Sequence, residues 1–570
     1  MRFIILTILL SGILATSYAE TDSLIIKGRI QNLSGRLYRQ ASFINFSRNN
    51  ILQPQSELSK QAPLEPDGSF RLSLPMLFSQ EEIYLDYGGR AFATFLGSPG
   101  TVEITFNGDS IGKAKKLFFF AGVNADANNQ YPLYVDAENK IAESNKAVAS
   151  SLISNSKDLL GPNFFKSFWQ RGTPEAKSLV KSREQLRLSA LQNISQNAML
   201  SPVLFQWVKS ITDEEGLQLM YEHAMGTDYV VPKDLLDSLE KLKNPPLTGQ
   251  RVIWANRFGN YADIIVGNRK ISNPARVNSL PVRLMSTLIR NNAVNLTPDE
   301  RQHLDNITAN GLTEKGELDF MNKLFAKNEM VLNLLFNFER ENRIYGEVFD
   351  STATEFLKVR YLAKNMYKFT YPQQLVLNKY IQSRTGLPQF RQSLDEIVAL
   401  EVRDSADIRK IINFKDVRTD PAEALPGYWL AASNDRGTSW FNRVLDTYKG
   451  KTVYLAKWNI EDPKSREELD FIPALQASLP EDVVFLYVHL ADEENNTSEQ
   501  LLRQYIVRHK LKGTHLFLNN DQVMDMLFRL NPLDTGTFAL IRPNGKFAMK
   551  NASPPSAREK TVQAILQAGN

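Results

Sequence analysis

Ser465 and two histidines are the residues whose types could support hydrolytic chemistry in this chain. A serine hydroxyl is not ionised near neutral pH, so Ser465 would need a histidine as its base and an acid to orient that histidine. His489 and His515 lie in the second and third expected strands of the C-terminal region. His489 alternates with Tyr487 there, which is typical of a residue inside a sheet. The sequence favours structural roles and keeps a serine–histidine–acid triad as the minor alternative.

Asp462 precedes Ser465 at the expected start of a helix. At such a position an aspartate or serine caps free backbone N–H groups and interacts favourably with the helix dipole. Glu467 and Glu468 follow closely, as is typical of capped helices. We therefore expect Asp462 and Ser465 to stabilise the helix start rather than to react.

The chain contains no cysteine and only five histidines. Without a thiol it can form no disulfide, thiolate nucleophile, iron–sulfur cluster or thiolate–zinc site. Five histidines in 570 residues are too few to favour a histidine-built zinc site. We therefore expect no metal and no cofactor.

Two oxygen-rich stretches match a cation loop only in part. Asn124-x-Asp126-x-Asn128 has the first three ligand positions of a calcium loop, but Asn129 replaces its glycine and Val135 its terminal glutamate. We reject this match. The acidic turn at 492–494 is expected to be solvated, and a loose cation site there is the minor alternative.

The charge is balanced, with 67 Lys and Arg against 63 Asp and Glu. A net charge of +4 does not favour a nucleic-acid footprint or an electrostatically held membrane protein. The composition, 43% hydrophobic and 23% charged, is that of an ordinary globular protein. The length predicts about three to four domains.

Residues 1–19 have the pattern of a cleaved secretory signal, with a basic start, an apolar run over 3–15 and small residues at Ser17 and Ala19. We expect the mature chain to begin near Glu20 and to be exported, most simply to the periplasm. An uncleaved anchor is the alternative, but as a helix the run reaches only about 20 Å against roughly 30 Å of hydrocarbon. No later stretch predicts a transmembrane segment.

The elements that would position these residues fall into three regions. Residues 20–110 alternate apolar and polar residues between turn signals, which predicts an antiparallel β-sandwich. Residues 111–417 show helical periodicity, with helices expected at 175–196, 318–338 and 355–369. We expect this central all-α region to form a core of its own, and a buried ligand pocket is the minor alternative.

Residues 418–570 predict a small α/β domain with a mixed sheet covered on both faces, so the whole chain is a multi-domain α+β protein. The strands are expected at 452–458, 483–490, 515–518, 538–541 and 547–550. The helices are expected at 466–478, 499–509 and 558–567.

Several stretches of this region carry a family resemblance: GKTVYLAKWNIEDPKSREEL, KLKGTHLF, FALIRPNGKF, NASPPSA and the upstream ALPGYWLAASNDRGTSW. They resemble the thioredoxin-like domain of exported TlpA/ResA-type thiol-disulfide oxidoreductases, in forms common in Bacteroides-type members. The resemblance covers about 426–570. More weakly, DGSF, SPGTVEI and FAGVNADANNQY are similar to the β-sandwich that precedes such domains and to its join with a helical segment.

The departures from this family bear on function. Aligned on 453–455 and Trp458, Asp462 and Ser465 stand where the family carries its two cysteines. Counted back from the turn at 544–546, Gly536 stands where the family carries a cis-proline. Glu461 stands where a second aromatic residue is usual. Thiol–disulfide exchange needs a thiolate and a resolving thiol, so the resemblance implies a thioredoxin-like fold without the redox reaction.

The resemblance also implies a groove for an extended substrate. In this sequence it would consist of Trp458, Asp462, Pro463, Lys464, Ser465, Thr535, Gly536 and Thr537. We expect a non-catalytic exported protein whose thioredoxin-like domain binds or scaffolds a protein or peptide of the cell envelope. The alternative is an accessory or non-thiol enzyme of the thioredoxin/peroxiredoxin-like superfamily, acting in envelope redox homeostasis, for example beside a cysteine-bearing partner.

Overall fold

The computed structural model describes residues 23–114, 116–149, 159, 163–195, 199–227, 231–272, 280–490, 499–530 and 537–569. Contacts divide the chain into two compact units. The first consists of residues up to 363 together with 379–395, and the second of residues 364–378 and 396–570. This division differs from our sequence-based limits at 110 and 417, because the N-terminal strands and most of the helices belong to one unit.

Two four-stranded sheets share one hydrophobic core in the first unit. One has the order β4-β1-β7-β8, with β4 (Ser69–Pro75), β1 (Ser23–Gln31), β7 (Gly100–Asn107) and β8 (Phe119–Gly122). The other has the order β3-β2-β5-β6, with β3 (Gln53–Pro63), β2 (Phe43–Asn50), β5 (Glu81–Tyr87) and β6 (Ala91–Gly97). The short helix α2 (Gly35–Gln40) connects β1 to β2, and the 3-10 turn η1 (Gly108–Ser110) follows β7.

Our expectation of purely antiparallel pairing is wrong for one pair of strands. β1 pairs with β7 in parallel, with Ile26 opposite Val102, whereas its other neighbour β4 is antiparallel. The two parallel strands are far apart in the chain, so no tight hairpin has to join them. The expected glycine turns do occur, since Gly68 and Gly88 have φ of 82° and 58°.

The helices of the first unit begin with α3 (Ala125–Ala149), α4 (Asn163–Trp169), α5 (Thr173–Ser195), α6 (Pro202–Gly226), α7 (Lys233–Asp237), η2 (Ser238–Lys243) and α8 (Gly249–Ser272). They continue with α10 (Val282–Asn292), α11 (Pro298–Asn310), α12 (Glu317–Lys327), α13 (Glu329–Val348) and α14 (Ser351–Asn365). η3 (Met366–Lys368), α15 (Tyr371–Arg384) and α16 (Pro388–Asn413) follow.

The single helix expected at 318–338 is in fact two helices, α12 and α13, because the chain breaks at Asn328. The Asn328 side-chain amide donates to the carbonyl of Leu324 and accepts a hydrogen bond from the backbone of Val294. These bonds satisfy the end of α12 and hold the break. The helix expected at 355–369 instead begins and ends earlier, since α14 runs from Ser351 to Asn365 and η3 follows it.

A buried carboxylate ties the sheets to the helices within the first unit. Glu82 of β5 accepts hydrogen bonds from the indole of Trp207 at 2.7 Å and from the backbone of Gly249 at 2.6 Å. It also accepts one from the hydroxyl of Tyr84 at 2.9 Å. Burial raises the pKa of Glu82. The hydrogen bonds connect β5 to α6 and α8, which explains why strands and helices form one unit.

The second unit contains a seven-stranded mixed sheet of order β15-β14-β11-β12-β13-β10-β9. Its strands are β9 (Ala422–Leu425), β10 (Tyr428–Ala432), β11 (Val453–Trp458), β12 (Val484–His489), β13 (Gly513–Phe517), β14 (Thr537–Ile541) and β15 (Phe547–Ala552). The strands β10, β13, β12 and β11 run parallel, and β9, β14 and β15 pair antiparallel with their neighbours. The expected mixed sheet is confirmed.

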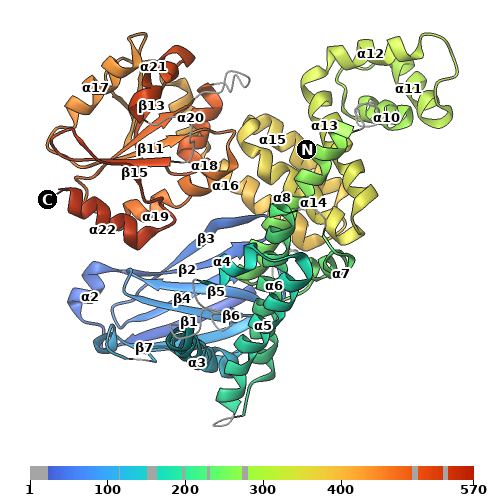
Figure 1. Cartoon of the computed structure of the whole chain (residues 1–570). Coiled ribbons are helices and arrows are strands. Elements are labelled where there is room, and N and C mark those ends of the chain that lie inside the picture. The colour runs from blue at the N-terminus through green and yellow to red at the C-terminus, as the bar shows by residue number, and fades with distance from the viewer. Residues whose placement is uncertain are drawn as a thin grey trace, which may run out of the picture. The chain divides into compact units, whose positions relative to one another are not determined.

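Helices cover both faces of this sheet (Figure 1). One core contains Leu455 and the side chains of α17 (Gly437–Thr447) and α21 (Asn520–Leu530). The other contains Trp458 and the side chains of α18 (Pro463–Leu469), α19 (Ile472–Gln476), α20 (Glu499–Arg508) and α22 (Arg558–Gly569). The helix expected at 466–478 is split into α18 and α19, and α17 and α21 were not among the expected helices.

Two pieces of the central helical region belong to the second unit. Ile408 and Ile411 from the end of α16 and Tyr367 from η3 are buried in the same core as Trp458. The α/β core therefore includes residues well before 418. Among the described residues, we find no helix that combines the length and the apolar character needed to span a membrane.

Candidate functional site

The site expected from the sequence is the turn between β11 and α18. Asp462 is the N-cap of α18, and its carboxylate accepts hydrogen bonds from the backbone of Lys464 and of Ser465, each at 3.1 Å. Pro463 occupies the first helical turn, where its missing N–H costs nothing. The expected capping by Asp462 is confirmed.

Ser465 and His489 hold adjacent backbone amides of the same turn. The buried Ser465 hydroxyl accepts from the N–H of Asn459 at 3.3 Å, and His489 Nε2 lies 3.5 Å from the N–H of Ile460. Burial lowers the pKa of His489 to about 4, so the ring is neutral near pH 7 and can accept this bond. These contacts make both residues structural supports of the turn and do not assemble a nucleophile and its base.

His515 is also part of the sheet's interior. Its ring stacks on Tyr487 at 4.4 Å between centroids, and Nε2 lies 2.8 Å from the carbonyl oxygen of Leu511, to which it donates. Burial lowers the pKa of His515 to about 3, so this histidine is neutral as well. The serine–histidine–acid alternative therefore finds no support in the described geometry.

Two residues of the expected groove lie inside the protein. Trp458 is 1% exposed and stacks on Tyr505 at 5.5 Å, and Ser465 is fully buried. Neither can line an open groove in this state, so this part of the expectation is wrong. Pro463 and Lys464 are exposed, and Thr537 begins β14 opposite Lys457. Thr535 and Gly536 lie outside the described residues.

A segment that sequence reasoning missed lies against this turn. The hydroxyl of Tyr367 in η3 donates to Glu461 Oε2 at 3.1 Å, and Lys368 Nζ lies 3.4 Å from the same oxygen. The guanidinium of Arg466 in α18 stacks over the Tyr367 ring, 4.2 Å from its centroid. Tyr367 precedes Glu461 by 94 residues and lies in a helical pattern, so no local sequence signal pairs them.

A second group of polar residues lies between the end of α18 and the end of α20. His509 Nδ1 pairs with Asp470, and the His509 ring stacks on Tyr505 at 3.9 Å between centroids. The Tyr505 hydroxyl is buried without a hydrogen-bond partner among the described residues, and burial raises its pKa well above the ordinary value. This cluster is built into the core between α18 and α20.

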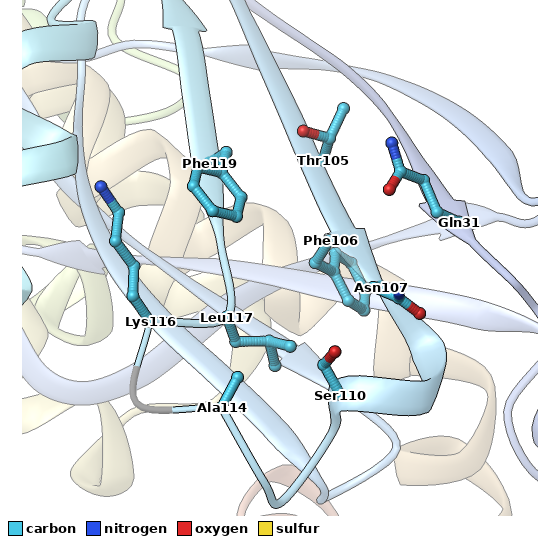
Figure 2. Close-up of a pocket in the computed structure, with 9 residues that line it drawn as sticks. All are labelled: Gln31, Thr105, Phe106, Asn107, Ser110, Ala114, Lys116, Leu117 and Phe119. Atoms are coloured by element: carbon cyan, nitrogen blue, oxygen red, sulfur yellow. The ribbon is translucent and has the colours of Figure 1, made fainter.

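The described part of the first unit contains a hollow of about 350 Å³, next to the ends of β1, β7 and β8 (Figure 2). It is lined by Gln31, Thr105, Phe106, Asn107, Ser110, Ala114, Lys116, Leu117 and Phe119. Among the described lining residues, Lys116 carries the charge, and its ammonium group lies 5.2 Å from the centre of the exposed Phe119 ring. Among the described residues, no three His, Asp or Glu side chains gather as a metal site.

Comparison with known proteins identifies a distant structural neighbour. No protein-family model matches the chain, and no curated protein matches it. A match covers 22% of this chain and 80% of the solution structure of a "putative thiol-disulfide oxidoreductase from Bacteroides vulgatus", with 21% identity and a TM-score of 0.18. A TM-score this low supports no argument about function. The function has to be inferred from the strand order of the second unit and from the residues of the turn between β11 and α18.

Proposed function

We propose that this chain is an exported, periplasmic protein whose C-terminal unit is a thioredoxin-like domain without redox activity, and that this unit binds a protein or peptide of the cell envelope. The observation that carries the proposal is the turn before α18. The scaffold of strand, tryptophan and helix start is retained there, but Asp462 and Ser465 use their oxygen atoms for backbone N–H groups. A turn whose polar side chains are used for its own backbone favours a binding surface over a reaction.

The redox part of the proposal is tested with the purified mature chain. We expect no reduction of insulin disulfides with dithiothreitol as the electron source and no consumption of hydrogen peroxide, because the chain has no cysteine to carry the electrons. A thioredoxin run in parallel is the positive control. Turnover that is proportional to the protein and survives repurification would favour the accessory-enzyme alternative.

The binding part is tested by photo-crosslinking in cells with the full-length chain. A photoreactive phenylalanine analogue is placed at exposed Lys464 beside the turn, and a matched control carries it at exposed Arg36 in α2 of the first unit. We expect a discrete crosslinked protein from position 464 alone. A truncation after 417 is a poorer test, because it would uncover Ile408 and Ile411 in the remaining chain. Equal crosslinking patterns from both positions would contradict the proposal.

A further inference from the structure

The segment Met366–Lys368, which we call the strap, belongs to the second unit and contacts the α/β part of that unit through all three of its side chains. Tyr367 and Lys368 both reach Glu461, the residue directly before the cap of α18. Arg508 of α20 donates to the sulfur of Met366 at 2.9 Å. Three successive residues of the strap are thus bound by side chains from two elements of the α/β unit.

The strap contacts are those that recognise an aromatic residue followed by a lysine. The Arg466 guanidinium lies over the Tyr367 ring, a cation–π geometry that selects an aromatic side chain. Arg466 also donates to the carbonyl of Ile460, which fixes its orientation. The Glu461 carboxylate accepts a hydrogen bond from the phenol hydroxyl and pairs with the ammonium group of the lysine that follows. An aliphatic core residue at 367 would use none of these groups.

The backbone of the strap is held in its turn by hydrogen bonds from residues that follow it in the chain. The buried Gln374 donates from Nε2 to the carbonyls of Met366 and Phe369, each at 3.0 Å, and the Phe369 N–H bonds to the Met366 carbonyl. Thr370 donates to the side chain of Gln373. The turn therefore has its own hydrogen bonds, and a short peptide of the same sequence can present the same side chains.

The strap is also accessible to competition. Tyr367 is 9% exposed, but Lys368 is 46% and Glu461 22% exposed at the side chain, so water and solutes reach the ion pair. Burial is the largest cause of the raised pKa of Tyr367, which keeps its proton on the hydroxyl for donation to Glu461. The half-exposed ion pair contributes little to stability, so a ligand can compete for it, and an aromatic residue of that ligand would restore the core contacts that buried Tyr367 makes.

We propose that the strap is an internal ligand, which occupies in cis a recognition site formed by Glu461, Arg466 and Arg508, and that the partner bound there is a polypeptide segment presenting an aromatic residue followed by lysine. This inference rests on the proposed binding function and specifies the site and the chemistry of its partner. The strap then limits partner binding to molecules that can displace it.

The inference is tested with the full mature chain and a fluorescent peptide of residues 364–374, Lys-Asn-Met-Tyr-Lys-Phe-Thr-Tyr-Pro-Gln-Gln, which includes the two glutamines that hold the turn. The variant Tyr367→Ala/Lys368→Ala opens the site, and Tyr371→Ala/Lys379→Ala in α15 is the matched control. We expect fluorescence anisotropy to show binding to the opened variant and none to the wild type or the control. Adding Glu461→Gln to the opened variant should weaken binding about tenfold or more.

A milder variant keeps the test decisive if the double alanine variant does not fold. Tyr367→Phe/Lys368→Gln retains the ring in the core and removes the hydroxyl and the charge, so it should fold and bind the peptide more weakly than an open site but better than wild type. Folding of each variant is checked by near-ultraviolet circular dichroism. Equal peptide binding to wild type and variants, or no binding to a folded variant, would overturn the inference.

Crosslinking from position 464 separates the two proposals. A higher yield of the same crosslinked partner in the opened variant than in wild type supports both. Equal yields in the two proteins would refute the strap and leave the binding function standing. Peptide binding to the opened variant with no crosslinked partner in cells would support the strap as an internal ligand and refute the envelope partner.

Discussion

At the scale of single residues, the turn between β11 and α18 is held by side chains acting on backbone N–H groups. Asp462 accepts hydrogen bonds from two such groups, while Ser465 and His489 accept one each. Buried backbone donors that lose their acceptor carry the full desolvation cost, which explains why these positions hold oxygen and nitrogen acceptors. Asp462, Ser465 and His489, which by type could form a catalytic set, therefore all stabilise the backbone of this turn.

Replacing the N-cap gives a direct test of this task. Asp462→Ala should lower the local stability of α18 by about 0.5–2 kcal/mol, because two backbone donors lose their acceptor, whereas Asp462→Asn should retain most of it. Hydrogen–deuterium exchange at the amides of Lys464 and Ser465 measures the effect. Unchanged exchange in the alanine variant would mean that the cap contributes nothing.

Glu184 of α5 gives a pH-dependent prediction in the first unit. It lies half-buried against Gly216 of α6, where burial and the Asp213 carboxylate raise its pKa to about 7. The folded state then keeps a proton that the unfolded chain loses near its ordinary value of 4.5. The contribution of Glu184 to stability therefore falls as the pH rises from about 4.5 to about 7 and levels off above that.

Glu184→Gln should remove this part of the pH dependence, because the amide does not ionise. The variant's unfolding temperature relative to wild type should be higher at about pH 8 than at about pH 5, as measured by calorimetry. Glu65→Gln, at an exposed turn, is the control and should show no such change. The same difference at both pH values would show that Glu184 titrates normally.

At the scale of elements, asparagines at the start of α3 bind the strands at the ends of both sheets. Asn128 accepts from the N–H of Leu96 in β6 and donates to its carbonyl, and Asn129 does the same for Phe120 in β8. A side-chain amide used in this way replaces the next strand of a sheet. The stretch 124–129, which resembles part of a calcium loop, thus pairs with the edge strands of both sheets and joins them to α3.

Asn128→Ala should destabilise the first unit by roughly 1–3 kcal/mol, because the buried N–H of Leu96 loses its acceptor and the Leu96 carbonyl keeps only Asn124 as a donor. Asn128→Asp should also be harmful, since a carboxylate cannot donate to that carbonyl. Urea unfolding measures the change in the free energy of unfolding. The exposed-loop variant Asn544→Ala is the control.

The elements that the sequence predicted well are those determined by local pattern. The run 453–458 is apolar except for Lys457, and it is a central strand, buried at every position. The α12–α13 break was missed because apolar spacing continues through Asn328, and the contact that holds the break comes from Val294. Parallel pairing of β1 with β7 was missed for the same reason, since strand partners distant in sequence leave no local pattern.

At the scale of the whole molecule, the chain passes from the first unit to the second at 363, returns at 378 and passes again at 395. Composition marks a change near 418, where helices give way to strands, but the contacts place the change within α16. The candidate site was predicted only in part for this reason. The capping role of Asp462 follows from the local sequence. The strap could not be predicted, because it lies 94 residues before Glu461 in a helical segment.

The end of α16 is fixed to the α/β core by one buried side chain. The Arg503 guanidinium of α20 donates to the carbonyls of Ile411, Ile412 and Phe414 at 3.0, 3.3 and 2.7 Å. These are carbonyls that the end of a helix leaves without an intrahelical partner, and Arg503 is 8% exposed. Removing the helix end would leave a buried guanidinium without these acceptors and would uncover apolar core.

We therefore expect a fragment of residues 396–570 to unfold more cooperatively, and at a higher temperature, than a fragment of residues 418–570. The longer fragment keeps the acceptors of Arg503 together with Ile408 and Ile411 of the core. Arg503→Ala in the longer fragment should bring its unfolding temperature toward that of the shorter one, while Lys560→Ala, at an exposed position of α22, should leave it unchanged. Identical transitions for the two fragments would show that the α/β unit begins at 418 after all, and that α16 contributes nothing to its core.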